Sequence, residues 1–227
     1  MNIDNALTIF ERLEKDMTHI PLDGDWQLTY FPQGKHSIAH PDDLAATGAK
    51  AIPARVPGNV ELDLHRAGLL PDPFYADNIR QLRSLESCEW WYTREFELDP
   101  KGFKNLSGLA GWDLVCAGLD TLATVWINGI EVGRAANMLI EHRFDVSGAL
   151  HPGVNRIAVR LESATACARA FHYDAATMSW EGREEGLFIR KAPHAWGWDI
   201  MPRAVSAGIW RSIWLEPRPA VAIEQLY

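Results

Sequence analysis

The chain has 227 residues, a net charge of −8 and a hydrophobic share of 47%. This composition is typical of a globular protein with enough apolar side chains for a core, and it argues against a disordered chain. The acidic balance argues against nucleic acid or an anionic membrane as the main partner, and no apolar run approaches the roughly 20 residues that cross a bilayer.

The first 19 residues are predicted to form a helical extension. Ile3, Leu7, Phe10 and Leu13 recur at helical spacing and would lie on one face of a short amphipathic helix. No basic segment followed by an apolar one occurs here, so this sequence shows no secretory signal. Three widely spaced cysteines form no metal-binding pair and are typical of buried free thiols in a reducing compartment, so we expect a cytoplasmic protein. These cysteines are Cys88, Cys116 and Cys167.

Alternating apolar and polar residues predict β-strands from about residue 24 onward. Residues 25–30 alternate, and so do residues 90–98 apart from Arg94, which interrupts the apolar face. Asn128 and Gly129 separate two further alternating runs. Because both residue types tolerate the positive φ angles of a type I′ turn, this pair predicts a tight β-hairpin.

Two more strands are predicted nearer the carboxyl end. Residues 154–161 alternate again, with apolar side chains inward and Ala158 outward between two arginines. Residues 208–215 are predicted to form one last strand. Several short strands separated by turn residues favour a β-sandwich over a parallel α/β sheet.

Two stretches do not follow the strand pattern. Residues 57–70 are predicted to form a short helix that starts near a proline and ends at Gly68. Residues 163–185 are rich in alanine and charge and lack a period of two, which predicts a long loop or insertion with one or two helical turns.

The carboxyl end suggests a domain boundary. Pro217 and Pro219 precede an apolar run that looks like a new strand, and the chain stops soon after at Tyr227. A natural protein seldom ends where a strand begins, so we expect the natural protein to continue. The expected organisation is a helical extension over residues 1–19, a β-sandwich over residues 20–217, and the start of a linker or strand into an immunoglobulin-like domain over residues 218–227.

Trp196 and Trp198 differ from the six tryptophans on predicted strands because they lie in a loop-like segment, next to Asp199 and near Arg203. An aromatic face can stack on the apolar face of a sugar ring, and a neighbouring carboxylate can accept hydrogen bonds from two sugar hydroxyls. The same segment would equally suit a buried corner in which Asp199 caps backbone N–H groups or pairs with Arg203. The spacing alone leaves both interpretations open.

Other polar residues give weaker signals. His142, His151, His172 and His194 have no ligand-like spacing, and Glu184–Glu185 is more typical of a solvated loop than of an acid/base pair. No GxSxG, HExxH, P-loop or dinucleotide-binding motif occurs. We therefore expect no metal and no cofactor.

An ordered set of short motifs runs through roughly residues 20–217. The set comprises Pro21–Trp26, Val56–Gly58, Asp72–Tyr75, Trp90–Phe96, Gly118–Thr121, Asn128–Gly129, Asn137–Met138, Phe144–Val146, Phe188–Ala192, Gly197–Asp199 and Gly208–Arg211. Together these motifs resemble the amino-terminal sugar-binding domain of glycoside hydrolase family 2, in its β-mannosidase-like branch. After the Gly-Trp-Asp motif that branch usually continues Trp-Gly-Pro-Arg, whereas this chain has Ile200–Met201–Pro202–Arg203. The shape of the loop or its sugar preference is expected to differ accordingly.

The resemblance implies an all-β fold, namely a jelly-roll β-sandwich of the galactose-binding-domain type with a short N-terminal helix and a few short helical insertions. It also implies an immunoglobulin-like domain and a catalytic (β/α)₈ barrel in the same protein. Retaining hydrolysis there uses two glutamates on the barrel. The family places its acid/base in an Asn-Glu pair, which this chain lacks. The chain alone is therefore expected to be inactive.

The resemblance further implies four substrate-binding residues, namely Trp198, Asp199, Arg190 and Arg203. The loop would reach the sugar at the non-reducing end, where Asp199 accepts hydrogen bonds from hydroxyls and one arginine holds Asp199 in place. The expected function is a non-catalytic domain of an exo-acting retaining β-glycosidase that hydrolyses O-glycosyl bonds. Its partners would be a terminal β-linked sugar, mannose as first choice, and the catalytic barrel. Two alternatives stay open: a free-standing carbohydrate-binding module, and a purely structural domain of a β-galactosidase- or β-glucuronidase-type enzyme.

Overall fold

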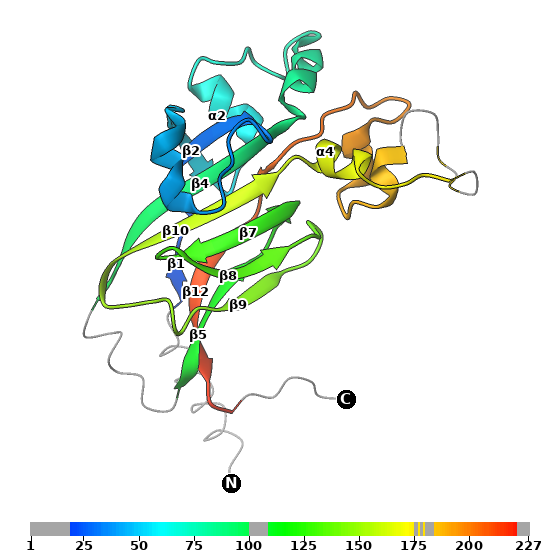
Figure 1. Cartoon of the computed structure of the whole chain (residues 1–227). Helices are drawn as coiled ribbons and strands as arrows, with labels where there is room; N and C mark the ends of the chain where they lie inside the picture. Colours follow the sequence, from blue (N-terminus) through cyan, green and yellow to red (C-terminus); the bar gives the residue numbers. More distant parts are fainter. Residues whose placement is uncertain (1–18, 100–108, 175–176, 178, 180–183, 222–227) are drawn as a thin grey trace, which may run out of the picture.

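A computed structural model of the chain describes residues 19–99, 109–174, 177, 179 and 184–221. Within these ranges two antiparallel sheets pack face to face, with short helices at their margins (Figure 1). This arrangement confirms the predicted all-β sandwich. The helix predicted over residues 1–19 lies outside the described residues except for His19, and so does the predicted strand beyond residue 221.

The strands form two large sheets and one small one. The larger sheet has the strand order β3-β2-β4-β10-β7-β8, and the smaller has the order β1-β12-β5-β9. The bounds in the larger sheet are β2 (Gly24–Pro32), β3 (Ile52–Val56), β4 (Cys88–Leu98), β7 (Leu122–Ile127), β8 (Ile130–Ala135) and β10 (Gly153–Glu162). Those in the smaller sheet are β1 (Ile20–Pro21), β5 (Leu109–Cys116), β9 (His142–Asp145) and β12 (Ile213–Pro219). A separate two-stranded sheet pairs β6 (Leu119–Asp120) with β11 (Gly208–Ile209).

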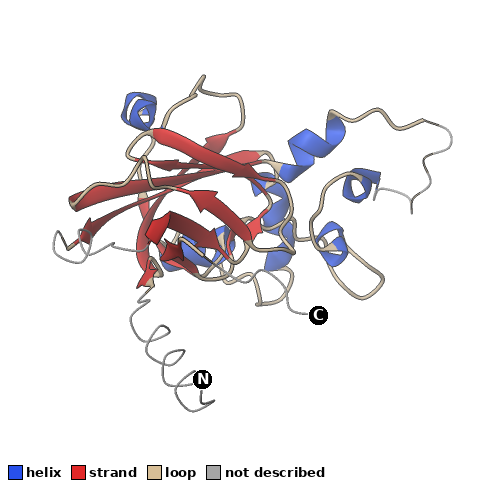
Figure 2. Cartoon of the chain, turned by 90° about the horizontal axis from the view of Figure 1, so that it is seen from below, coloured by secondary structure: helices blue, strands red, loops and turns tan. Residues whose placement is uncertain are grey.

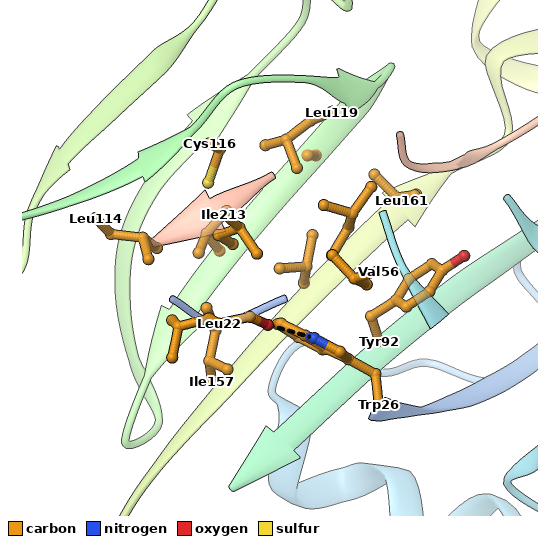
Figure 3. Close-up of a cluster of buried hydrophobic side chains, with 14 of the residues drawn as sticks. Leu22, Trp26, Val56, Tyr92, Leu114, Cys116, Leu119, Ile157, Leu161 and Ile213 are labelled. Carbon is orange, nitrogen blue, oxygen red and sulfur yellow. Dashed lines mark hydrogen bonds between the residues drawn. The ribbon is translucent and has the colours of Figure 1, made fainter. Parts of the chain in front are cut away.

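The main core lies between the two large sheets. Because successive side chains of a strand point to opposite faces, Ile157, Val159 and Leu161 of β10 enter this core, and all three are fully buried. Leu114 and Ile213 meet it from the smaller sheet (Figure 3). The Trp26 indole N–H donates a 2.8 Å hydrogen bond to the Leu22 carbonyl, which satisfies its donor inside the apolar core.

Two local predictions are confirmed. Asn128 and Gly129 have φ angles of 51° and 81° and form the tight turn between β7 and β8. The predicted helix is α2 (Val60–Arg66), whose first turn is capped by the Asn59 side chain and which is followed by Gly68 at a φ of 71°.

The irregular position in β4 has a structural reason. Arg94 replaces an apolar residue because its guanidinium donates hydrogen bonds to the carbonyls of Leu22 and Asp23, at 2.7 and 2.6 Å. These bonds give hydrogen-bond partners to two backbone carbonyls in the turn between β1 and β2. A charged side chain therefore occupies an inward position without being left unpaired.

The predicted orientation of β10 is confirmed, but its outer face is partly covered. Ala158 points outward as expected, and it is buried there in a second apolar cluster on the outer face of the larger sheet. Trp91 and Trp126 stack there, with ring centroids 5.3 Å apart. The 3₁₀ helix η1 (Pro41–Thr47) contributes Leu44 to the same cluster. A period of two distinguishes the two faces of a strand, but it does not reveal that a distant segment covers one of them.

The predicted last strand is corrected. Residues 208–215 form two strands, β11 and β12, and Trp210 lies in the break between them. The second strand continues through Pro217 to Pro219, which was expected in a linker. The domain boundary near residue 218 stays a prediction.

The remaining short helices agree with the expected insertions. Residues 163–185 contain α4 (Ala164–Arg169) and the start of the 3₁₀ helix η3 (Glu184–Leu187), and two other 3₁₀ helices are η2 (Asn78–Leu85) and η4 (Pro193–Trp196). In Figure 1, α2, α4 and the segment after residue 190 gather at the end of the sandwich away from the end of β12. Figure 2 shows these helices at the rim of the strands. The thiols of Cys88 and Cys116 are buried and free, and Cys167 is free and half-buried.

Candidate functional site

The predicted loop, residues 190–206, is here called the site loop. Its tip is a tight turn in which Trp198 and Met201 exchange backbone hydrogen bonds of 2.9 and 3.2 Å. Gly197 precedes the turn with a φ of 96°, a conformation that favours glycine. The two tryptophans beside this glycine differ in exposure: Trp196 is buried (3% exposed), whereas Trp198 is 49% exposed.

The tip presents an aromatic ring and a carboxylate to the outside. Asp199 is exposed, and none of the described residues forms a hydrogen bond or ion pair with its carboxylate. Ile200 follows it at 91% exposure. An indole and an uncommitted carboxylate at one tip are the groups that bind a polyhydroxylated ring, by stacking and by accepting hydroxyl hydrogen bonds.

A buried ion pair holds the two ends of the site loop together. Lys191 is almost completely buried, and its ammonium donates to both carboxylate oxygens of Asp120 in β6, each at 2.5 Å. The same ammonium donates to the backbone carbonyl of Ser206, at 2.7 Å. Because Lys191 opens the loop and Ser206 closes it, one side chain fixes both ends to the sandwich. The Thr121 hydroxyl also donates to the Asp120 carboxylate.

The network continues to α2 through a serine. The Ser206 hydroxyl donates a 2.7 Å hydrogen bond to Glu61, whose buried position raises the pKa of its carboxyl while Ser206 and Lys191 oppose that rise. Asp63, on the same helix, is also buried, and burial raises its pKa to about 6 against the lowering effect of the Arg55 N–H and of Arg66. These two carboxyls accept hydrogen bonds inside the domain and do not contact the exposed tip.

A second clamp holds the loop just after its tip. The Arg203 guanidinium donates to both oxygens of Glu86, at 2.8 and 2.7 Å, and contacts Glu185 at 2.7 Å. It also lies over the Trp196 ring, 5.2 Å from the ring centroid. The hydrogen bond to Glu86 is the largest of the effects that raise the pKa of Arg203. Glu185 was expected in a solvated loop, but its side chain is only 15% exposed and it is paired.

The structure brings together only some of the predicted site residues. Trp198 and Asp199 share the tip. Arg203 lies at its root with a side chain 8% exposed, and Arg190 is an exposed residue whose backbone carbonyl accepts a hydrogen bond from Met138. Neither arginine pairs with Asp199, so the expected arginine–aspartate contact is not formed. The buried-corner interpretation applies to Trp196 and not to the tip.

Two hollows flank the site loop. One has a volume of about 200 Å³ and includes Asp120, Lys191 and His194 among its lining residues. The other has a volume of about 330 Å³ and includes Asn59 and Trp210. In the described part of the chain no group of three or more His, Cys, Asp or Glu side chains is arranged to hold a metal ion.

Sequence reasoning missed the buried network. The family resemblance pointed to the tip residues, but nothing in the spacing pairs Lys191 with Asp120 or Arg203 with Glu86. A signal was present, because Asp120 lies in a largely apolar, strand-like run. A charged residue in such a run predicts a buried and paired charge.

Comparison with known proteins identifies related chains. Residues 35–211 match the family described as "Glycosyl hydrolase 2 galactose-binding domain-like". The β-mannosidase B of Thermothelomyces thermophilus is 32% identical over 201 residues, covering 87% of this chain and 21% of that protein. The β-mannosidase of Mus musculus is 30% identical over 178 residues, covering 74% of this chain and 20% of that protein. The chain thus spans about a fifth of the length of these relatives.

Solved structures show the same fold. The β-D-mannosidase of Dictyoglomus thermophilum superposes with a TM-score of 0.73 and 30% identity, covering 88% of this chain and 23% of that one. A Ruminococcus gnavus β-glucuronidase superposes with a TM-score of 0.52 and 16% identity over 90% of this chain and 29% of its own length, a likeness of fold alone. Within the described residues, no helix has the length and apolar character needed to cross a membrane.

Proposed function

The chain belongs to the glycosyl hydrolase 2 galactose-binding domain-like family, and we propose that it is the non-catalytic amino-terminal domain of an exo-acting retaining β-glycosidase that acts on β-mannosides. In this proposal the tip of the site loop completes the pocket for the terminal sugar, and the catalytic carboxylates belong to a barrel in the same protein. The relatives named β-mannosidase support this choice of substrate.

The proposal rests on the exposed side chains at the tip of the site loop. Trp198 is half exposed and the Asp199 carboxylate has no partner among the described residues, although the rest of the loop is tied to the sandwich by buried ion pairs. An exposed carboxylate on a fixed support does not contribute to the core. It is placed to accept hydrogen bonds from a ligand without first breaking internal ones.

The role assigned to the tip is orientation of the sugar. Asp199 would accept hydrogen bonds from two hydroxyls remote from the bond that is cleaved, while Trp198 covers an apolar face of the ring. Binding energy from remote groups raises the rate when it fixes the reacting geometry. This chain supplies binding and position, and the barrel would supply acid/base and nucleophile.

The test is replacement of Asp199 by alanine in the complete protein, with hydrolysis of an aryl β-mannoside as the assay. A hydrogen bond to a charged group contributes about 1.5–3 kcal/mol, so we expect kcat/KM to fall roughly 10- to 100-fold. Thermal unfolding should be unchanged, because Asp199 has no partner among the described residues. Asp43→Ala is the matched control, since Asp43 is exposed and its carboxylate forms no ion pair with a described residue.

The outcomes distinguish the proposed function from its two alternatives, a structural domain and a free-standing carbohydrate-binding module. An Asp199→Ala protein with activity within twofold of the parent would leave the loop a structural role only. Binding of mannose or manno-oligosaccharides by the 227-residue chain alone, as tightly as by the complete protein, would favour a free-standing binding module. Absence of β-mannoside hydrolysis by the complete protein would overturn the choice of substrate.

A further inference from the structure

A third hollow lies between η2 and the root of the site loop. It has a volume of about 450 Å³ and is lined by Ile79, Arg80, Arg83, Pro202 and Arg203. Pro202 also lines the smaller of the two hollows beside the loop, so this cleft is next to the tip. Three of its five lining residues are arginines, in a chain whose net charge is −8.

The geometry of η2 directs two of these arginines to one side. In a 3₁₀ helix the residues i and i+3 lie above one another, and Arg80 and Arg83 have this spacing within Asn78–Leu85. Both side chains therefore leave the same face of the helix and line the same cleft. Arg203 reaches the cleft from the site loop.

The charges in the cleft do not cancel. Glu86 and Glu185 both contact Arg203, and Arg83 approaches Glu86 only at 4.0 Å. Arg80 forms no ion pair with any described residue. Arg169 also contacts Glu185, at 2.9 Å, so Arg203 and Arg169 match the two carboxylates and the positive charges of the two exposed arginines of η2 are left over.

A cleft of this kind suits one chemical class. Guanidinium groups match a carboxylate through paired N–H donors. We propose that this cleft binds the carboxylate of a uronic acid in a saccharide whose neighbouring sugar lies at the tip of the site loop. The position of the neighbouring sugar rests on the proposed function, whereas binding of the carboxylate does not.

The test compares two disaccharides that differ in their carboxylates, β-1,4-dimannuronate and β-1,4-mannobiose, by calorimetric titration of the chain at low ionic strength. We expect dimannuronate to bind at least about tenfold more tightly. This preference should disappear in Arg80→Ala/Arg83→Ala and weaken in 0.5 M salt, because exposed charges are screened. The matched control is Arg55→Ala/Arg156→Ala, which removes two arginines from exposed surface pairs.

Each outcome decides the proposal. Equal affinity for the two disaccharides, or an Arg80→Ala/Arg83→Ala chain that binds dimannuronate as the parent does, would overturn it. Acetate that binds as tightly as dimannuronate would show a site for a free anion and would overturn the saccharide part. Asp199→Ala separates this inference from the proposed function: the preference for the acidic disaccharide should persist there, even if the affinity for both ligands falls.

Discussion

Replacing Lys191 by methionine is expected to lower the free energy of unfolding by about 3–5 kcal/mol, because it leaves the Asp120 carboxylate buried without its charge partner. The side chains of Lys191 and Asp120 are 1% and 7% exposed, so water cannot replace the lost ammonium. Methionine keeps most of the volume of lysine, which limits any effect of a cavity. A domain is typically stable by about 5–15 kcal/mol, so this one change removes a large share.

A double-mutant cycle isolates the pair from other effects. Asp120→Asn alone should also be costly, because it leaves the ammonium buried. Lys191→Met/Asp120→Asn should cost much less than the sum of the single changes, with a coupling of at least about 2 kcal/mol. The assay is urea unfolding followed by tryptophan fluorescence, with unchanged m values as evidence for a common native state.

An exposed pair provides the control. Arg55 and Asp25 form an ion pair at 2.8 Å with side chains 58% and 91% exposed, and the same cycle there should give a coupling of about 0.2–1 kcal/mol. Two results would refute the reasoning. One is a cost below 1 kcal/mol for Lys191→Met, and the other is additive single changes at Lys191 and Asp120. Either would mean that the ammonium does not clamp the loop.

Two further predictions concern stability. Burial raises the pKa of Asp63 to about 6 from its usual 3.8, so the native state binds this proton more tightly than the unfolded chain, and the stabilisation present below about pH 4 is lost as the pH rises through 6. Asp63→Asn should therefore gain stability relative to the parent by roughly 1–3 kcal/mol between pH 4 and pH 7; a constant difference in urea unfolding across that range would contradict this. Gly129→Ala should cost about 1–2 kcal/mol because Gly129 has a φ of 81°, and an unchanged melting temperature would contradict the prediction.

The parts of the fold that depend on neighbouring residues were predictable. The turn at Asn128 and Gly129 needs two residues that adopt positive φ, and the sequence places them between two alternating runs. The helix ending near Gly68 follows from the same kind of local chemistry. The burial of Ala158 on the outer face was not predictable, because it depends on η1, which lies more than a hundred residues earlier in the chain.

The candidate site divides in the same way. The types of Trp198 and Asp199 left a structural and a sugar-binding interpretation open, and the resemblance of Gly197–Asp199 to a family motif singled them out as candidates. Their support was not found, because Lys191 is 71 residues from Asp120 and Ser206 is 145 residues from Glu61. A charged residue in an apolar run indicates that a partner exists, but the topology alone decides which one it is.

The two ion pairs that hold the site loop, Lys191–Asp120 and Arg203–Glu86, explain how its tip can differ from the family pattern. Ile200 and Met201 stand where the β-mannosidase-like branch usually has Trp-Gly, and they are 91% and 45% exposed. Exposed residues away from caps and buried pairs change stability little when they are replaced. Lys191 and Arg203 hold the loop on the sandwich, so residues of the tip can be exchanged while the loop keeps its position. A loop already held in place also loses less conformational entropy when a ligand binds. If the tip binds sugar as proposed, stability and sugar preference would reside in different residues of the same short segment.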